Sequence, residues 1–523
     1  MFQEVITDVA ILTMPSAHRA QSGRYRFGRT ANRLIRPGPL ATAVLLVAST
    51  SGCAVGPQFA RPSAPEVTRY TSGDLLSATR SAEVVTGTSQ QFILGADIPA
   101  QWWSVFRSAP LNRLIDLALR SNPNLQAAYA TLRSTREVDL AERGLLIPAA
   151  SFALSGTREK LAGETYGESI PSSLFSVSTA SVNAMYFLDI FGGVRRRVES
   201  AAAREEWQRC QLAAAYLTLT SNVVVAAIAE ASLRAQLAAT QEISEAEAQQ
   251  LSVLKQQVEV GGASGAAVLA EEAILAQTRT LVPGLQKQLL QTRFRLLMLA
   301  GRFPSEDPGF TFDLTALELP RELPVSLPSK LVEQRPDIRA AEAVLHQATA
   351  EVGVATANML PQIALTATYG SAASSASDLF GPGTALWTLT GNLVQPLFNG
   401  GSLIHQRRAA VAALDAATDI YRQTVLGAFG QVANVLSAIQ TDADALVAAV
   451  TAERAADNSL AVARGQYQAG AITYVALLSA EQTYQQTRIA LVEAQASRLS
   501  DTAALFQALG GGWWNTNLNV VSK

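Results

Sequence analysis

The 523-residue sequence is poor in the side chains on which many enzymes and small stable folds depend. It has two cysteines, Cys53 and Cys210, so a network of disulfides cannot hold the chain together. Its three histidines, His18, His346 and His405, are widely separated, and no Ser-His-Asp grouping, metal-ligand spacing or phosphate-binding loop accompanies them. We therefore expect no catalytic site, no metal and no cofactor.

The sequence also has no basic run that would suit nucleic acid. It contains 41 basic and 43 acidic residues. Six arginines and two acids lie in residues 1–52, so removal of that segment leaves 35 basic and 41 acidic residues. The remaining chain is mildly acidic, and nucleic acid is not an expected partner.

The N-terminal residues have the pattern of an export signal. Arginines come first, from Arg24 to Arg36 without an intervening acid, and a mainly apolar run follows from Leu40 to Ala48. This run is nine residues long, against roughly 20 for a membrane-spanning helix, so it is too short for a stable anchor.

The end of this signal, Ser51-Gly52-Cys53, resembles the lipobox of bacterial lipoproteins, whose cysteine is diacylated and becomes the new N-terminus. Thr50 departs from that motif, which usually has leucine three positions before the cysteine. Residues 1–52 are interpreted as a leader and lipoprotein signal peptide, and Cys53 as the lipid attachment site. The alternative is an ordinary cleaved signal with an incidental cysteine. Cys210 lies in a helical pattern and is expected to be a small packing residue.

The rest of the chain contains a duplicated unit of about 200 residues. Five short motifs recur in the same order, at offsets of 207 to 213 positions. The pairs are Asn122-Pro123-Asn124-Leu125 with Arg335-Pro336-Asp337-Ile338, Leu146-Ile147-Pro148 with Met359-Leu360-Pro361, Phe191-Gly192-Gly193 with Phe398-Asn399-Gly400, Val260-Gly261-Gly262-Ala263-Ser264 with Ala469-Gly470-Ala471-Ile472-Thr473, and Leu299-Ala300-Gly301 with Ala508-Leu509-Gly510. The expected organisation is an N-terminal segment at 53–109, repeats at 110–301 and 336–510, a linker at 302–335 and a tail at 511–523.

Each repeat is predicted to combine membrane-type strands with long helices. A helix opens it, at about 110–146 and about 336–359, with a proline near the N-terminus. Two strand-like segments, a very long helix, a glycine-containing turn and a second long helix follow. Alternation defines the strands: Ile363, Leu365, Ala367 and Tyr369 point to one face, and Gln362, Ala364, Thr366 and Thr368 to the other. Each such run is about ten residues, the length of a tilted transmembrane β-strand.

A seven-residue spacing runs through the long helix predicted at about 402–468. Val411, Val425, Val432, Ile439 and Leu446 are in register, which is typical of a coiled coil. At 1.5 Å per residue, this helix would extend on the order of 100 Å. A soluble helical bundle is the alternative, and the membrane-type strands argue against it. Because four strands cannot close a barrel and open edges are excluded from lipid, at least two chains must pool their strands.

The chain resembles the TolC-like outer membrane factors, in the lipoprotein branch that includes NodT-type efflux proteins. The residues that carry this resemblance extend from about 52 to 514. They are Gly52-Cys53-Ala54-Val55-Gly56-Pro57 with Arg61-Pro62, Trp102-Trp103-Ser104-Val105-Phe106, Leu111-Asn112-Arg113-Leu114-Ile115, Asn122-Pro123-Asn124-Leu125, Leu188-Asp189-Ile190-Phe191-Gly192-Gly193, Arg335-Pro336-Asp337-Ile338, Gln395-Pro396-Leu397-Phe398-Asn399-Gly400-Gly401 and Ala508-Leu509-Gly510-Gly511-Gly512-Trp513.

The resemblance implies a mainly α-helical homotrimer whose membrane part is a β-barrel. Four strands from each chain would form a twelve-stranded barrel in the outer membrane, above a long α-helical coiled-coil tunnel in the periplasm. The implied partners are outer membrane lipid, a periplasmic adaptor and an inner-membrane pump, often of the proton-driven resistance-nodulation-division type. Ala54, rather than aspartate, after the lipidated cysteine fits sorting to the outer membrane. The implied function is passive conduction of pump substrates out of the cell.

A non-conducting structural lipoprotein, which binds partners through its helices, is the alternative function. The amphipathic strands argue against it. The pairs Trp102-Trp103 and Trp513-Trp514 could stack on a ligand, but packing of the terminal segments against the helices is the preferred interpretation.

The resemblance also implies a periplasmic gate at the hairpin tips, predicted at Val260–Ala267 and Ala469–Ser479. Relatives commonly have Tyr-Leu-x-Leu-Leu-Asp-Ala at the second tip, and their aspartates ring the narrowest point of the closed channel. Here Ala267 and Ser479 occupy positions where relatives often place an acid.

The predicted gate residues are Tyr467, Val475, Ser479 and Gln482. The last three share one helix face by their spacing of four and three, and Tyr467 is expected to help latch neighbouring helices. We predict an apolar, hydroxyl-lined and weakly cation-selective constriction, unless acids at 272 and 481 turn inward. The alternative is that Ser479 only packs between helices.

Overall fold

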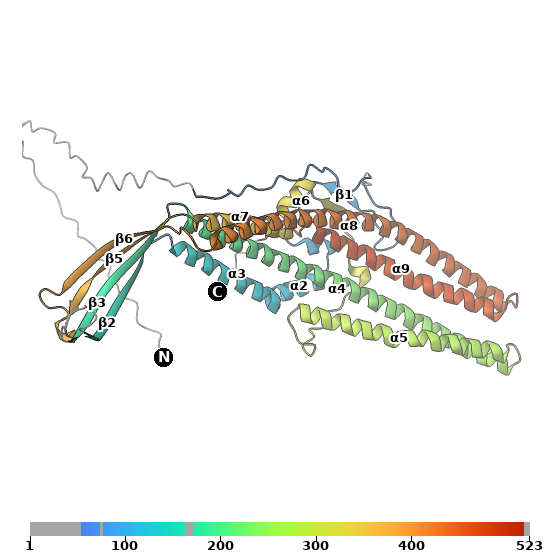
Figure 1. Cartoon of the computed structure of the whole chain (residues 1–523). Coiled ribbons are helices and arrows are strands. Elements are labelled where there is room, and N and C mark those ends of the chain that lie inside the picture. The colour runs from blue at the N-terminus through green and yellow to red at the C-terminus, as the bar shows by residue number, and fades with distance from the viewer. Residues whose placement is uncertain (1–53, 74–76, 163–171, 517–523) are drawn as a thin grey trace, which may run out of the picture. The chain divides into compact units, whose positions relative to one another are not determined.

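The computed structural model describes residues 54–73, 77–162 and 172–516, so Cys53 lies outside the described residues. Long helices dominate it (Figure 1). They are α2 (Ala109–Ser121), α3 (Pro123–Gly144), α4 (Gly193–Glu259), α5 (Gly265–Leu299), α6 (Pro328–Gln334), α7 (Pro336–Ala357), α8 (Ser402–Gln468) and α9 (Tyr474–Ala508), with short 3-10 turns at Trp102–Phe106, Leu314–Ala316, Ala376–Asp378 and Trp513–Asn515.

The two halves of the chain have matching elements, which confirms the internal duplication. Helices α3 and α7 have 22 residues each, α4 and α8 have 67, and α5 and α9 have 35. A strand pair stands between the 22-residue and the 67-residue helix in both halves. The end of α8 at Gln468 agrees with the limit expected from the proline-free heptad pattern.

The single opening helix predicted at about 110–146 is wrong, because the structure has two helices there. Helix α2 ends at Ser121 and α3 begins at Pro123. Asn122 between them is extended, as a residue before proline prefers. Its side chain caps α3 by accepting from the N–H of Leu125, and its Nδ2 donates to the carbonyl of Leu299 at 2.9 Å. Arg335 separates α6 from α7 before Pro336 in the same way.

The four predicted membrane-type strands form one antiparallel sheet. They are β2 (Ala149–Leu161), β3 (Ser173–Leu188), β5 (Gln362–Ala373) and β6 (Ala385–Val394), in the order β2-β3-β5-β6. Within the described residues, β2 and β6 each have one edge without a partner strand. This sheet adjoins the helices at one end, since β2 follows α3 and β3 leads into α4 after a few residues (Figure 1).

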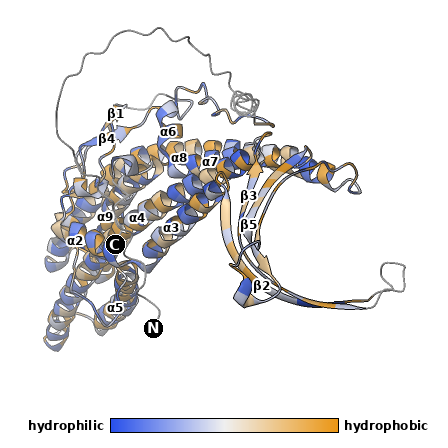
Figure 2. Cartoon of the chain, turned by 90° about the vertical axis from the view of Figure 1, so that its left-hand side faces the viewer, coloured by the Kyte–Doolittle hydropathy of each residue, from blue (hydrophilic) through white to orange (hydrophobic). Residues whose placement is uncertain are grey.

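The strand register gives this sheet one apolar and one polar face. Phe152, Val182, Tyr369 and Trp387 lie directly opposite one another across the four strands, and so form one row. The next row, on the other face, is Ser151, Asn183, Thr368 and Thr388, in which Thr368 donates to Asn183 at 2.9 Å. Both hydrophobic and hydrophilic segments are visible along the strands (Figure 2). The alternation predicted from the sequence is confirmed.

A second, small sheet was not predicted. Strand β1 (Gln91–Leu94) pairs in parallel with β4 (Glu322–Val325). Beside it, Arg498 of α9 is fully buried and donates to the carbonyls of Thr86 and Thr88 at 3.1 and 2.7 Å. These hydrogen bonds hold the N-terminal segment against α9.

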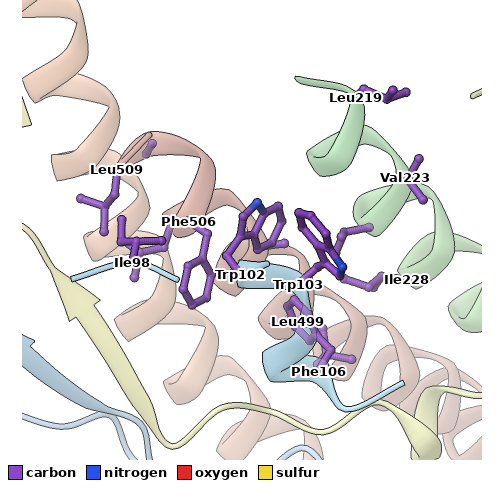
Figure 3. Close-up of a cluster of buried hydrophobic side chains, with 14 of the residues drawn as sticks. Ile98, Trp102, Trp103, Phe106, Leu219, Val223, Ile228, Leu499, Phe506 and Leu509 are labelled. Carbon is purple, nitrogen blue, oxygen red and sulfur yellow. The ribbon is translucent and has the colours of Figure 1, made fainter. Parts of the chain in front are cut away.

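The tryptophan pair near the N-terminus belongs to the hydrophobic core. Trp102 and Trp103 are buried, and Trp102 stacks on Phe506 of α9 with ring centroids 5.4 Å apart. Figure 3 shows both rings with Phe106 between residues of α4 and α9. Core packing, rather than ligand stacking, is confirmed for this pair. Cys210 is likewise fully buried, as expected for a packing residue.

The heptad seam of α8 is buried over most of its length. Val425, Val432, Ile439 and Leu446 are buried, whereas Val411, nearer the sheet, is 36% exposed. Within one chain, the seam is therefore part of the hydrophobic core only from about Val425 onward. Its first residue, Val411, is partly exposed.

Truncation of this seam should destabilise the protein. Because Ile439 is fully buried, Ile439→Ala should lower the free energy of unfolding by about 2–5 kcal/mol. The drop should be seen as a lower thermal midpoint, measured by circular dichroism in detergent. Ser437→Ala changes an exposed position two residues away and serves as the control. Equal midpoints for the Ile439 variant and the wild type would contradict this assignment of the core.

Candidate functional site

The hairpin turns are shorter than the predicted tips. Helix α4 ends at Glu259 and α5 begins at Gly265, where Ser264 accepts from the N–H of Ala267 as the N-cap. In the second hairpin, α8 ends at Gln468 and α9 begins at Tyr474, after the N-cap Thr473. Position 479 therefore lies inside α9, not in the turn.

The structure brings together three of the four predicted gate residues. Val475, Ser479 and Gln482 are exposed on one face of α9, and Val475 is 70% exposed. Ser479 is exposed, so within the described residues it does not pack between helices. Tyr467 lies apart from this face: it is half-buried at the end of α8, with its ring 5.2 Å from that of Tyr474.

Below the turns, the two hairpins share a small hydrophobic cluster, which we call the tip cluster. All four long helices contribute to it. Its buried members are Leu254 of α4, Ala267 of α5, Leu460 and Ala463 of α8, and Tyr474, Leu477 and Leu478 of α9. Burial of Tyr474, Leu477 and Leu478 fixes the orientation of α9, and this directs Val475 and Ser479 away from the chain's own core.

Three buried carboxylates interrupt the packing of the tips, and no sequence pattern predicted that they form a group. Glu271 of α5 is fully buried and accepts from the Tyr474 hydroxyl of α9. Glu247 of α4 accepts from Thr278 at 3.0 Å and from Gln485. These contacts connect the first hairpin to α9 of the second, next to the tip cluster.

The third buried carboxylate, Glu481, was considered in the sequence analysis as an acid that could enter the channel. It is only 7% exposed and pairs with Arg464 of α8 at 3.6 Å. Glu272, the other such acid, pairs with Lys255 of α4 at 2.8 Å. Neither carboxylate shares the face of Val475 and Ser479.

Burial disfavours the charged forms of this acid group. Desolvation raises the pKa of Glu271 to about 7, and the negative charges of Glu481 and Glu247 add to the rise against the hydrogen bond from Tyr474. Desolvation also raises the pKa values of Glu247 and Glu481 above their usual range. One oxygen of each of the three carboxylates is buried without a hydrogen-bond partner among the described residues. The closed packing of the tips is therefore favoured when these acids hold protons.

A pH dependence follows for the packing of the tips. An acid whose folded-state pKa lies above its value in water destabilises the packed state as pH rises between the two values. For Glu271 this window runs from its usual value of 4.5 to about 7. Hydrogen exchange at the start of α9, corrected for intrinsic rates, should therefore become faster across this window.

Variants separate this effect from general charge repulsion. Glu271→Gln keeps an acceptor for Tyr474 without the charge, so most of the pH dependence should vanish and protection should persist. Glu245→Gln removes an exposed acid of α4 and should behave as the wild type does. An unchanged pH dependence in Glu271→Gln would contradict the role given to this carboxylate.

The residues that follow position 53 lie where the sheet meets the helices. The N–H of Val55 donates to the carbonyl of Phe191 at 3.0 Å, between β3 and α4. Gly56 has φ of +92°, and a Cβ there would lie 2.5 Å from the Cα of Gly353 in α7. Phe59 stacks on His346, which lies about two turns before Gly353 in α7. Ala54 is thus held at the boundary between the sheet and the helical body.

Known proteins are similar to this chain over most of its length. The profile of the family described as "Outer membrane efflux protein" matches twice, at residues 114–302 and 327–511. The pyoverdine export outer membrane protein OpmQ of Pseudomonas putida is 31% identical over 419 residues, which cover 79% of this chain and 88% of that protein. The outer membrane protein OprJ of Pseudomonas aeruginosa is 27% identical, with 92% and 97% covered.

Solved structures show the same fold. The outer-membrane channel OprN is 26% identical, with a TM-score of 0.79, over 88% of this chain and all of that one. The Campylobacter jejuni CmeC outer membrane channel has a TM-score of 0.80 at 21% identity, over 89% of this chain and 96% of that one.

Proposed function

The chain belongs to the outer membrane efflux protein family, and we propose that its hairpin tips are the periplasmic gate of the channel that three copies form. Its function is that of an outer membrane efflux channel, placed in the outer membrane and extending into the periplasm. Such channels are trimers that work with a periplasmic adaptor and an inner-membrane pump.

The channel assignment is carried by the four-stranded sheet, whose two edges have no partner strand in the part of the chain that the structure describes. Its apolar face needs lipid, and its edges need partner strands, because bare backbone is not tolerated in a membrane. Three such sheets supply twelve strands, enough for a closed barrel. The polar row of Ser151, Asn183, Thr368 and Thr388 then lines the inside of the barrel.

We infer that the inner-membrane partner is a pump of the resistance-nodulation-division type. The support is the family's tripartite assembly together with the relatives, which include a toluene efflux pump protein of Pseudomonas putida. In this proposal the pump, rather than the channel, sets the cargo.

Lipidation of Cys53 is part of the proposal. The boundary position of Ala54 supports it, because an acyl chain on the preceding residue would enter the membrane at the foot of the sheet. Intact mass of the purified protein should give a mature chain that begins at Cys53 and carries acyl groups. Cys53→Ala should lose the acyl mass but still yield membrane-bound trimers, held by the barrel. An unmodified wild-type thiol, or a mature N-terminus elsewhere, would disprove lipidation.

The gate is proposed on the exposed face of α9, with Val475, Ser479 and Gln482 toward the channel axis and Tyr467 supporting the tip cluster from behind. Planar-bilayer recordings should show a conducting but weakly cation-selective wild-type channel, poorly blocked by a trivalent cation from the periplasmic side. Ser479→Asp adds three carboxylates at a narrow ring, which should lower the half-blocking concentration by about tenfold or more.

The neutral variant Ser479→Asn provides the matched control and should be blocked as weakly as the wild type. If the Ser479→Asp and wild-type channels were blocked equally well, Ser479 would not be at the constriction. A wild-type trimer that inserted without conducting would favour the structural-lipoprotein alternative instead.

A further inference from the structure

We propose that Arg158 and Lys160, at the far end of β2, bind the phosphates of the glycolipid that forms the outer leaflet of the outer membrane. The proposal rests on the outer-membrane location of the barrel. It does not depend on the position of the gate, on lipidation of Cys53 or on the transported substrate.

The register places both basic side chains on the lipid-facing side of the sheet. Strand β2 pairs with β3 without interruption from Ala149 to Leu161, so every second residue of β2 points to the same face. Phe152 and Leu154, which are 70% and 69% exposed, define that face as the apolar one. Arg158 and Lys160 continue the same series, opposite Ser176 and Leu174 of β3.

Their height along the strands coincides with the edge of the membrane. On β5, the outward series runs from Ile363 to Ala373, and Ala373 lies level with Gly156 of β2 through Ser178. Ten residues at about 3.3 Å each, tilted by about 40°, cover about 25 Å of membrane thickness, the height of the apolar band on such barrels. Arg158 is two residues beyond Gly156, and therefore just outside the hydrocarbon.

The end of the strands that bears this pair faces away from the cell. Strand β2 starts four residues after α3, so its beginning adjoins the periplasmic helices and Leu161 lies at the opposite end. The leaflet met there is the outer one, which in these membranes consists mainly of phosphorylated glycolipid. Two cations about 7 Å apart on one strand suit an anionic headgroup surface.

Neither cation is neutralised by the described part of the chain. Arg158 and Lys160 are exposed, and neither has an ion pair or side-chain hydrogen bond within residues 54–73, 77–162 and 172–516. Glu159, the acid between them, points to the opposite face by the strand alternation. The hydroxyl of Ser176, directly opposite Arg158, adds a hydrogen-bonding group to the same face.

The test is a lipid titration of the detergent-purified, full-length trimer by native mass spectrometry. The probes are the bisphosphorylated acylated glucosamine disaccharide, the same glycolipid without phosphates, and phosphatidylglycerol. We expect Arg158→Gln/Lys160→Gln to bind the bisphosphorylated glycolipid about 5- to 30-fold more weakly, since each cation near a lipid surface contributes about 1 kcal/mol. The matched control, Arg321→Gln/Lys330→Gln, removes two exposed cations of the periplasmic region and should bind as the wild type does.

The lipid comparison shows which group is recognised. The wild type should prefer the bisphosphorylated glycolipid to both other lipids, and the β2 double variant should lose that preference while remaining trimeric. Equal binding by the double variant and the wild type would overturn the proposal, as would equal loss in the control variant. A wild type that binds the phosphate-free glycolipid, or phosphatidylglycerol, as tightly as the bisphosphorylated one would overturn it as well.

Discussion

The two edges of the four-stranded sheet, which have no partner strand among the described residues, are the constraint on which the rest of the structure depends. Strands β2 and β6 each present a row of backbone N–H and C=O groups, which lipid cannot satisfy. The sheet is therefore stable in a membrane only when copies of the chain complete one another. A ring of copies also constrains the long helices below the sheet. Each helix must pack against its own chain on some faces and leave other faces for the neighbouring copies.

The uneven burial of α8 shows this division along one helix. Its seam is buried within the chain at Val432, Ile439 and Leu446, but Val411, in the same heptad register, is partly exposed. Leu426 and Ile420, on other faces of the helix, are 68% and 58% exposed. A single soluble domain would have little reason to expose such residues. We expect neighbouring helices to pack on these faces in a closed ring of three chains.

The parts of the fold that the sequence predicted are those governed by local periodicity. Alternation along β5 and the heptads of α8 each repeat over many residues, so the strands and the 67-residue helix were predictable. The break at Asn122 had a local signal, Pro123, which was interpreted as a helix start without ending the helix before it. The β1–β4 pair was missed because each strand has four residues and the partners lie about 230 positions apart.

The candidate site likewise has one part that the sequence predicted and one part that it did not. Spacing alone predicted that Val475, Ser479 and Gln482 share a face, and the buried side of α9 then fixes its direction within the chain. The acid group was not predictable, because Glu247, Glu271 and Glu481 come from three helices that only the tertiary packing brings together. Arg498 differs from these acids in degree. Its two terminal nitrogens donate to several carbonyl and hydroxyl oxygens and only its Nε is buried without a partner among the described residues, whereas each tip carboxylate has one of its two oxygens buried without a partner there. A buried charge with many hydrogen bonds holds its surroundings together more strongly than one with few. We therefore expect the tips to separate more readily than the central region around Arg498.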